Sequence, residues 1–132
     1  MRCYLDSNIV MYFVENRALW APTVAARFAA MRSRGDTLVT SDLARMECRI
    51  GPLRRKDLAL LADFDAFFAA GVFVASISAE VCDRAAEIRA TFGFTPMDAI
   101  HLAAAMVSGC EVFLTNDARL GSFSHMTIET LS

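Results

Sequence analysis

The sequence predicts a single α/β domain with a mostly parallel sheet of about five strands and helices on both faces. Short β-branched or apolar segments alternate with longer segments whose apolar residues recur every three or four positions. This alternation is typical of parallel sheets covered by helices. With 132 residues, 55% of them hydrophobic, and no linker rich in Pro, Gly or Ser, residues 1–132 are expected to form one domain around one sheet.

Each element is expected from local pattern and from the residues that flank it. The expected strands are 2–5, 37–39, 72–75, 111–114 and 126–128, which are short and apolar or β-branched. The expected helices are 7–14, 21–34, 43–50, 58–68, 81–92 and 96–108. Asp6 or Ser7 can cap the first helix, Gly35 follows the second, and Gly51-Pro52 is expected to end the third.

Composition excludes several classes of protein. A net charge of −2 provides no bulk electrostatic case for nucleic acid binding, although Lys56 is the only lysine among 13 basic residues and arginine suits bidentate phosphate contact. No apolar run reaches the ~18 residues that a membrane span needs, and the first residues lack a secretory signal. The four cysteines lack metal-site spacing, so we expect buried thiols in the cytoplasm.

Two acidic residues come shortly after predicted strands. Asp6 directly follows strand 2–5, and Asp117 comes three residues after Leu114, the last residue of strand 111–114. In parallel sheets, sites form beyond the carboxyl ends of the strands. Each residue could instead simply cap the helix or turn that follows it.

Two further acids lie in predicted helices. Glu47 lies on or beside the apolar stripe of Leu43, Met46 and Ile50, where an unpaired carboxylate is costly. It could instead reach solvent, or pair with a neighbouring arginine. Asp98 opens an apolar, centrally placed helix and has capping-box spacing from Thr95.

The four acids together predict a cation site. Clustered carboxylates repel one another, and such a cluster is poorly tolerated without cations. Oxygen ligands without a cysteine or histidine partner select Mg²⁺ or Mn²⁺ over Zn²⁺. His101 shares a helix face with Asp98, and we expect it to be a hydrogen-bonded core residue and assign no general base.

Taken in order and spacing, these motifs resemble those of the PIN domain family, most closely the VapC-type toxin ribonucleases of bacterial toxin–antitoxin pairs. The similarity spans essentially the whole chain and rests on residues 6–8, Glu47, residues 98–103 and residues 114–117. It implies that Asp6, Glu47, Asp98 and Asp117 bind Mg²⁺ or Mn²⁺ and are catalytic. Asn8 and Thr115 match positions that support these acids. Residues 118–120 lack the further acid of some relatives, which leaves the number of metal ions open.

The resemblance also implies an activity and partners. It implies a metal-dependent endoribonuclease that hydrolyses RNA phosphodiester bonds as the toxin of a toxin–antitoxin pair. The expected partners are RNA, a VapB-like antitoxin and a second copy in a homodimer, with operator DNA reached only through the antitoxin complex and no membrane. A basic group near Glu47 could steer RNA phosphates or could be a solvated charged turn. Its members are Arg45, Arg49, Arg54, Arg55 and Lys56.

Other readings remain open at this point. A non-catalytic receiver-like signalling module has a similar fold, but receivers usually pair acids after the first strand, where this chain has Asp6 alone. An aspartyl phosphatase of the haloacid dehalogenase type would have a second aspartate at the position of Asn8. A catalytically silent PIN domain kept only for binding is the third alternative, against which the complete set of four acids argues.

Overall fold

Five strands and six α-helices alternate along the chain in a computed structural model that describes residues 1–131. The strands are β1 (Arg2–Leu5), β2 (Thr37–Ser41), β3 (Phe73–Ala75), β4 (Val112–Thr115) and β5 (Thr127–Thr130). The helices are α1 (Ser7–Val14), α2 (Ala21–Ser33), α3 (Asp42–Arg55), α4 (Leu58–Ala69), α5 (Ala79–Phe92) and α6 (Pro96–Val107), with a short 3-10 helix, η1 (Ala118–Ser122). Within residues 1–131, no helix is long and apolar enough to span a membrane.

The strands form one parallel sheet in the order β3-β2-β1-β4-β5. In the central strand β1, Cys3 pairs with Leu38 of β2 on one side and with Val112 of β4 on the other. This confirms the predicted α/β class and the parallel sheet. The order differs from the 2-1-3-4-5 order of receiver-like, flavodoxin-type sheets, which argues against the signalling alternative.

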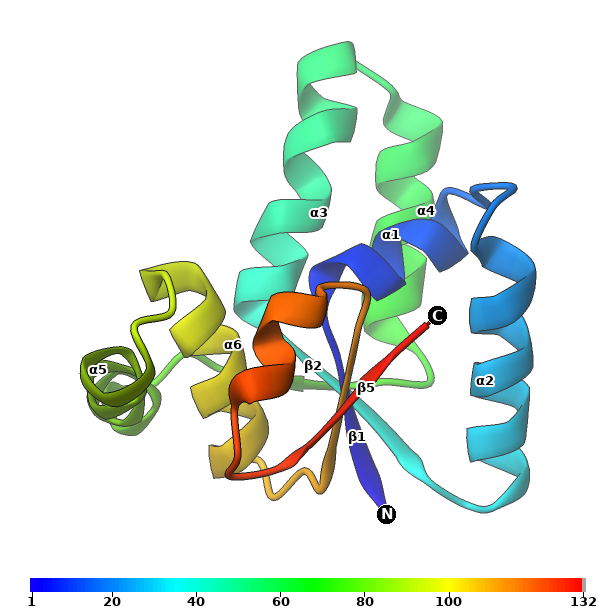
Figure 1. The fold of residues 1–132 in the computed structure, drawn as a ribbon. Coiled ribbons are helices and arrows are strands. Elements are labelled where there is room, and N and C mark those ends of the chain that lie inside the picture. Colours follow the sequence, from blue (N-terminus) through cyan, green and yellow to red (C-terminus); the bar gives the residue numbers. More distant parts are fainter. Residues whose placement is uncertain (132) are drawn as a thin grey trace.

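The sheet separates two hydrophobic cores (Figure 1). Leu5 and Phe64 belong to the core that α1, α2, α3 and α4 cover, whereas Tyr4 and Leu102 belong to the core under α5 and α6. Neighbouring residues of β1 point to opposite faces, as strand geometry requires. Helices therefore cover both faces of the sheet, as predicted.

Most of the aromatic residues near α1 and α4 fill the first core. The ring of Phe13 lies 4.8 Å from that of Phe28 and 6.0 Å from that of Phe67, while Phe64 and Phe68 are buried. Such ring pairs add to the stability that comes from burying their area. Packing between α1, α2 and α4 therefore accounts for these aromatic side chains.

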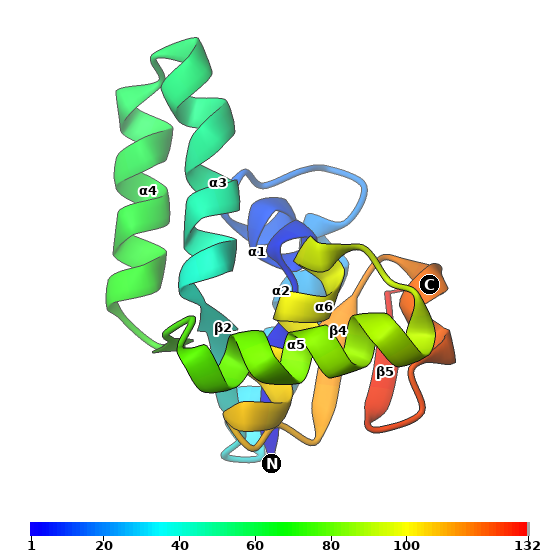
Figure 2. The same cartoon turned by 90° about the vertical axis from the view of Figure 1, so that its left-hand side faces the viewer.

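The prediction that α3 ends at Gly51-Pro52 is wrong. The helix continues to Arg55 with Pro52 buried inside it, and α3 and α4 form an antiparallel hairpin that projects from the sheet (Figure 2). Proline removes one helical hydrogen bond, but packing of α3 against α4 offsets that loss. The helix ends instead at Lys56, whose backbone is left-handed with φ 55°.

Lys56→Gly is expected to stabilise the protein, because a residue with a Cβ is strained in the left-handed region and glycine is not. The free energy of unfolding should rise by about 0.5–1 kcal/mol in urea titrations. Lys56→Ala is the matched control, since it removes the charge and keeps the Cβ. Equal stability of the two variants would contradict a conformational cause.

Candidate functional site

The strand order changes direction between β1 and β4. From β1 the chain adds β2 and then β3 on one side, and it adds β4 and β5 on the other. Ligands of open α/β sheets bind beyond the carboxyl ends of the strands at such a switch point. Here the Asp6 backbone amide donates to the Leu114 carbonyl at 3.0 Å, which holds the ends of β1 and β4 together.

Asp6 lies at this junction with its residue only 7% exposed. Its Oδ1 accepts a hydrogen bond from the Ser7 amide at 2.8 Å, and its Oδ2 accepts one from the Thr115 hydroxyl at 2.7 Å. Burial raises the pKa of Asp6 above its usual 3.8, although His101 and these two hydrogen bonds act in the opposite direction. Asp6 therefore caps α1, as the simpler interpretation held, and also presents a carboxylate to the switch point.

Asn8 and Thr115 tie the turn after β4 to the start of α1. The Asn8 amide lies 3.5 Å from Asp6 Oδ2, and its Oδ1 accepts from the Asn116 backbone amide at 3.3 Å. The Thr115 hydroxyl also accepts from the Asp117 amide at 3.0 Å. Both side chains thus contact the acids or their backbone, at the positions that the family resemblance implies for supporting residues.

Glu47 reaches the site from the middle of α3. Its Oε1 lies 2.5 Å from His101 Nε2, which in turn lies 3.8 Å from Asp6 Oδ1. Burial acts to raise the pKa of Glu47, but contact with His101 outweighs it, and the pKa lies below its usual 4.5. Burial acts to lower the pKa of His101, but Glu47 and Asp6 outweigh it, and that pKa lies above 6.5.

The other nitrogen of His101 is held by a buried hydroxyl pair. The Tyr4 hydroxyl lies 2.7 Å from His101 Nδ1 and 2.7 Å from Ser41 Oγ. With a neutral imidazole, Tyr4 donates to Nδ1 and Nε2–H donates to Glu47; with imidazolium, Nδ1–H donates to Tyr4, which donates to Ser41. Rotation of two hydroxyls therefore satisfies either protonation state without moving the ring.

Asp98 and Asp117 form a second carboxylate pair, which Arg119 bridges. Arg119 Nη2 lies 3.5 Å from Asp98 Oδ2 and also contacts Asp117 Oδ2, while Nε lies 3.0 Å from Asp117 Oδ1. The hydrogen bonds from Arg119 lower the pKa of Asp117 below 3.8. The Asp98 amide donates to Thr95 Oγ1 at 3.2 Å, so Thr95 caps α6 while the Asp98 carboxylate faces Arg119.

Sequence reasoning singled out the four acids but did not predict the side chains of the protein that contact them. The expectation that His101 is a hydrogen-bonded core residue is confirmed, since it is buried and bonded to Tyr4. Contacts with Asp6 and Glu47 were not expected of His101. The only sequence signal was its spacing of three from Asp98 on an apolar helix. Arg119 offered a similarly weak signal, a basic residue two positions after Asp117.

The predicted apolar stripe of α3 is also wrong. Met46 and Ile50 are exposed, whereas Leu43 and Cys48 are buried. A short helix with apolar residues on two sides does not show which side its neighbours cover. Glu47 nevertheless lies half-buried at the boundary, and its partner is His101 instead of an arginine of α3.

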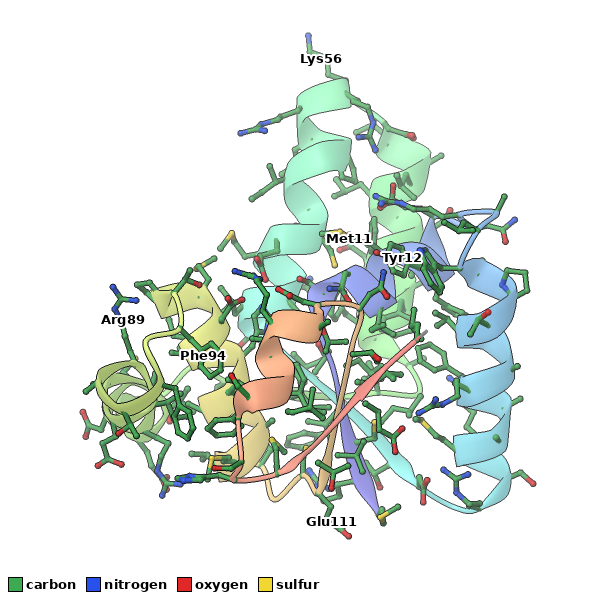
Figure 3. All side chains as sticks on the ribbon, in the orientation of Figure 1. Met11, Tyr12, Lys56, Arg89, Phe94 and Glu111 are labelled. Carbon is green, nitrogen blue, oxygen red and sulfur yellow. The ribbon has the colours of Figure 1, made fainter. Side chains whose placement is uncertain are left out.

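The basic group occupies two different environments. Arg45 and Arg49 both form ion pairs with Asp65 of α4, at 3.6 Å for Arg45. The remaining three members lie exposed at the outer end of the α3–α4 hairpin, where Figure 3 shows Lys56 pointing away from the molecule. They are Arg54, Arg55 and Lys56.

The donor set suits a hard divalent cation in chemistry, since it consists of four carboxylates beside neutral oxygen donors. Across residues 1–131, no three Asp, Glu, His or Cys side chains gather closely enough to hold a metal ion as they stand. The two pairs are nonetheless adjacent, because Thr115 Oγ1 contacts both Asp6 and the Asp117 amide, and Asp98 lies three residues before His101 on α6. The acids can therefore bind such an ion only if a side chain that bridges them moves away from the carboxylate oxygens.

The chain belongs to the PIN domain family, whose pattern it matches over residues 3–126. No match was found among curated protein sequences. The strand order places the candidate site beyond the carboxyl ends of β1 and β4.

Solved structures share the fold at low sequence identity. Rickettsia felis VapBC2, bound to a DNA fragment from its promoter, contains a chain with a TM-score of 0.83 and 15% identity, and 98% of each chain is covered. DNA-bound VapBC from Salmonella typhimurium contains a chain with a TM-score of 0.77 and 21% identity, and the match covers 100% of this chain and 99% of that chain. Mycobacterium tuberculosis VapC20, a toxin that cleaves the sarcin–ricin loop, has a TM-score of 0.74 and 17% identity to this chain. The match covers 92% of each of the two chains.

The contact between Glu47 and His101 predicts a pH-dependent stability of the metal-free protein. Because the pKa of His101 is raised in the folded protein, its protonation stabilises the fold fully below about pH 6.5. This stabilisation is lost as pH rises through the folded-state pKa of His101. Because the pKa of Glu47 is lowered in the folded protein, its ionised carboxylate stabilises the fold above about pH 4.5. This stabilisation is lost as pH falls through the folded-state pKa of Glu47. Glu47→Gln should therefore destabilise by about 1–3 kcal/mol near pH 5.5 and by less at pH 9.

Urea unfolding in the presence of a chelator measures this difference. The control is Glu87→Gln on α5, whose side chain is 74% exposed and lies 3.6 Å from Arg84. That control should change stability little at either pH. A Glu47→Gln effect of the same size at pH 5.5 and pH 9 would show that charge on His101 does not contribute.

Proposed function

We propose that this PIN-domain protein is a metal-dependent endoribonuclease that hydrolyses RNA phosphodiester bonds as the toxin of a toxin–antitoxin pair. The observation that supports it most is that two adjacent carboxylate pairs, Asp6 with Glu47 and Asp98 with Asp117, lie near the switch point of the sheet. Carboxylates that four separate segments hold near one another are costly unless a cation balances their charge. Membership of the PIN family and the likeness to VapC structures support the same conclusion.

In this proposal the four carboxylates are catalytic and hold Mg²⁺ or Mn²⁺. A divalent ion there would lower the pKa of an attacking water and neutralise charge on the leaving oxygen. Thr115 and the Ser7 amide keep both oxygens of Asp6 oriented, and they favour its ionised form against the effect of burial. His101 orients Glu47 through Nε2 while Tyr4 fixes the imidazole from behind.

The exposed end of the α3–α4 hairpin is our proposed contact for RNA phosphates. Arg54, Arg55 and Lys56 are exposed there, and the Arg55 guanidinium lies 4.0 Å from the Glu15 carboxylate. Arg45 and Arg49 lie closer to Glu47 in sequence but share Asp65, so much of their charge is already compensated. Exposed, weakly paired arginines are the better candidates for electrostatic contact with a polyanion.

The partners follow from the same proposal. Two of the similar structures are VapBC assemblies bound to DNA, and one of these DNA fragments comes from a promoter. We propose that this chain likewise binds a VapB-like antitoxin, forms a homodimer, and reaches operator DNA only through the antitoxin complex. Co-expression with a VapB-like antitoxin, followed by measurement of the mass of the complex, tests these partners.

Asp98→Asn should abolish RNA cleavage while leaving the fold intact, because it preserves side-chain shape and removes one carboxylate charge. The rate should fall by about 100-fold or more in a cleavage assay with Mn²⁺. Asp63→Asn, an exposed acid of α4, is the control and should keep full activity. Full activity of Asp98→Asn, or cleavage by the native protein that survives exhaustive EDTA treatment, would contradict the proposal.

Charge reversal of Arg54 and Arg55 to Glu should weaken RNA binding and reduce its dependence on salt, because fewer counter-ions are released on binding. The slope of log affinity against log salt should become shallower by about one for each lost phosphate contact. The matched control is Arg84→Glu on α5, outside the basic group. An unchanged affinity and slope for the double variant would identify this end of the hairpin as a solvated turn.

A further inference from the structure

The two carboxylate pairs of the site are each bridged by a nitrogen-bearing side chain, His101 for one and Arg119 for the other, but these two side chains differ in mobility. The His101 side chain is 4% exposed, belongs to the buried helix α6, and is fixed by Tyr4 from behind. The Arg119 side chain is 70% exposed and extends from the short helix η1. Arg119 can therefore leave its carboxylates and be hydrated by bulk water, whereas His101 cannot.

Arg119 also occupies oxygen atoms that a metal ion would need. Its Nε lies 3.0 Å from Asp117 Oδ1 and 3.2 Å from Oδ2, and its Nη2 contacts Asp117 Oδ2 and lies 3.5 Å from Asp98 Oδ2. Three of the four oxygens of this pair are thus in contact with one guanidinium. A divalent ion coordinates the same oxygens at about 2.0–2.6 Å, which excludes a guanidinium from the same positions.

We propose that Arg119 is a tethered counter-ion of the Asp98–Asp117 pair, which a divalent cation must displace, so that Arg119 sets the affinity of the site for metal. The inference rests on the proposed metal-dependent function and adds a residue that controls it. It also explains how the metal-free site tolerates a carboxylate pair outside the reach of His101. In that state the +1 charge of Arg119 partly balances the two carboxylates, and in the loaded state the metal does so.

The test is Mn²⁺ binding in the absence of RNA, measured by titration calorimetry and by the spectroscopic signal of free Mn²⁺. Arg119→Ala removes the competing cation, so the dissociation constant should fall by about three- to ten-fold at constant ionic strength. Arg119→Lys restores one charge without the planar fork and should lie between the native protein and Arg119→Ala. The control Arg84→Ala, which removes an arginine of α5, should bind Mn²⁺ as the native protein does.

The outcomes separate this inference from the proposed function. If the native protein binds Mn²⁺ and cleaves RNA, but Arg119→Ala binds Mn²⁺ equally or more weakly, the counter-ion role is wrong and the ribonuclease proposal stands. If neither protein binds Mn²⁺ at millimolar concentration and neither cleaves RNA, both are wrong. Circular dichroism and unfolding midpoints check that each variant is folded. If Arg119→Ala does not fold, Arg119→Gln serves as the second neutral variant.

Discussion

The burial of one carboxylate, that of Asp6, is the constraint on which the site depends. Asp6 ends the central strand and lies where β1 and β4 are joined by its own backbone amide. A buried carboxylate requires polar partners: here the first turn of α1 and the end of β4 supply hydrogen-bond donors, and His101 of α6 lies 3.8 Å away. Satisfying this one side chain therefore fixes the positions of three segments that are far apart in sequence.

The remaining acids are balanced in two different ways, and the difference has functional consequences. Glu47 contacts a buried imidazole whose far side is held by Tyr4 and Ser41, so this half of the site is rigid and its hydrogen bonds adapt to protonation. Asp98 and Asp117 contact an exposed guanidinium that can move away. One half of the site is thus held by buried hydrogen bonds, while the carboxylates of the other half contact an exposed arginine.

Much of the fold was predictable because each local signal agreed with the tertiary arrangement. The strand–helix alternation predicted the parallel sheet, and residues such as Gly93 and Thr95 mark helix ends where local chemistry requires them. The failures have a common cause. Gly51-Pro52 resembles a helix stop, and Met46 and Ile50 resemble a core stripe, but the neighbours of α3 decide both features. Packing against α4 carries the helix past Pro52 and leaves those two apolar side chains exposed.

The sequence alone determined which residues carry charge at strand ends and helix starts, and hence that Asp6, Asp98 and Asp117 were candidates for one site. Turn and cap chemistry is local, so its signals are contained in neighbouring residues. Only the tertiary structure decided how the acids are paired, that His101 lies between Asp6 and Glu47, and that Arg119 joins Asp98 to Asp117. These contacts join residues up to 95 positions apart. Their geometry depends on strand order and helix packing, which no short stretch of sequence encodes.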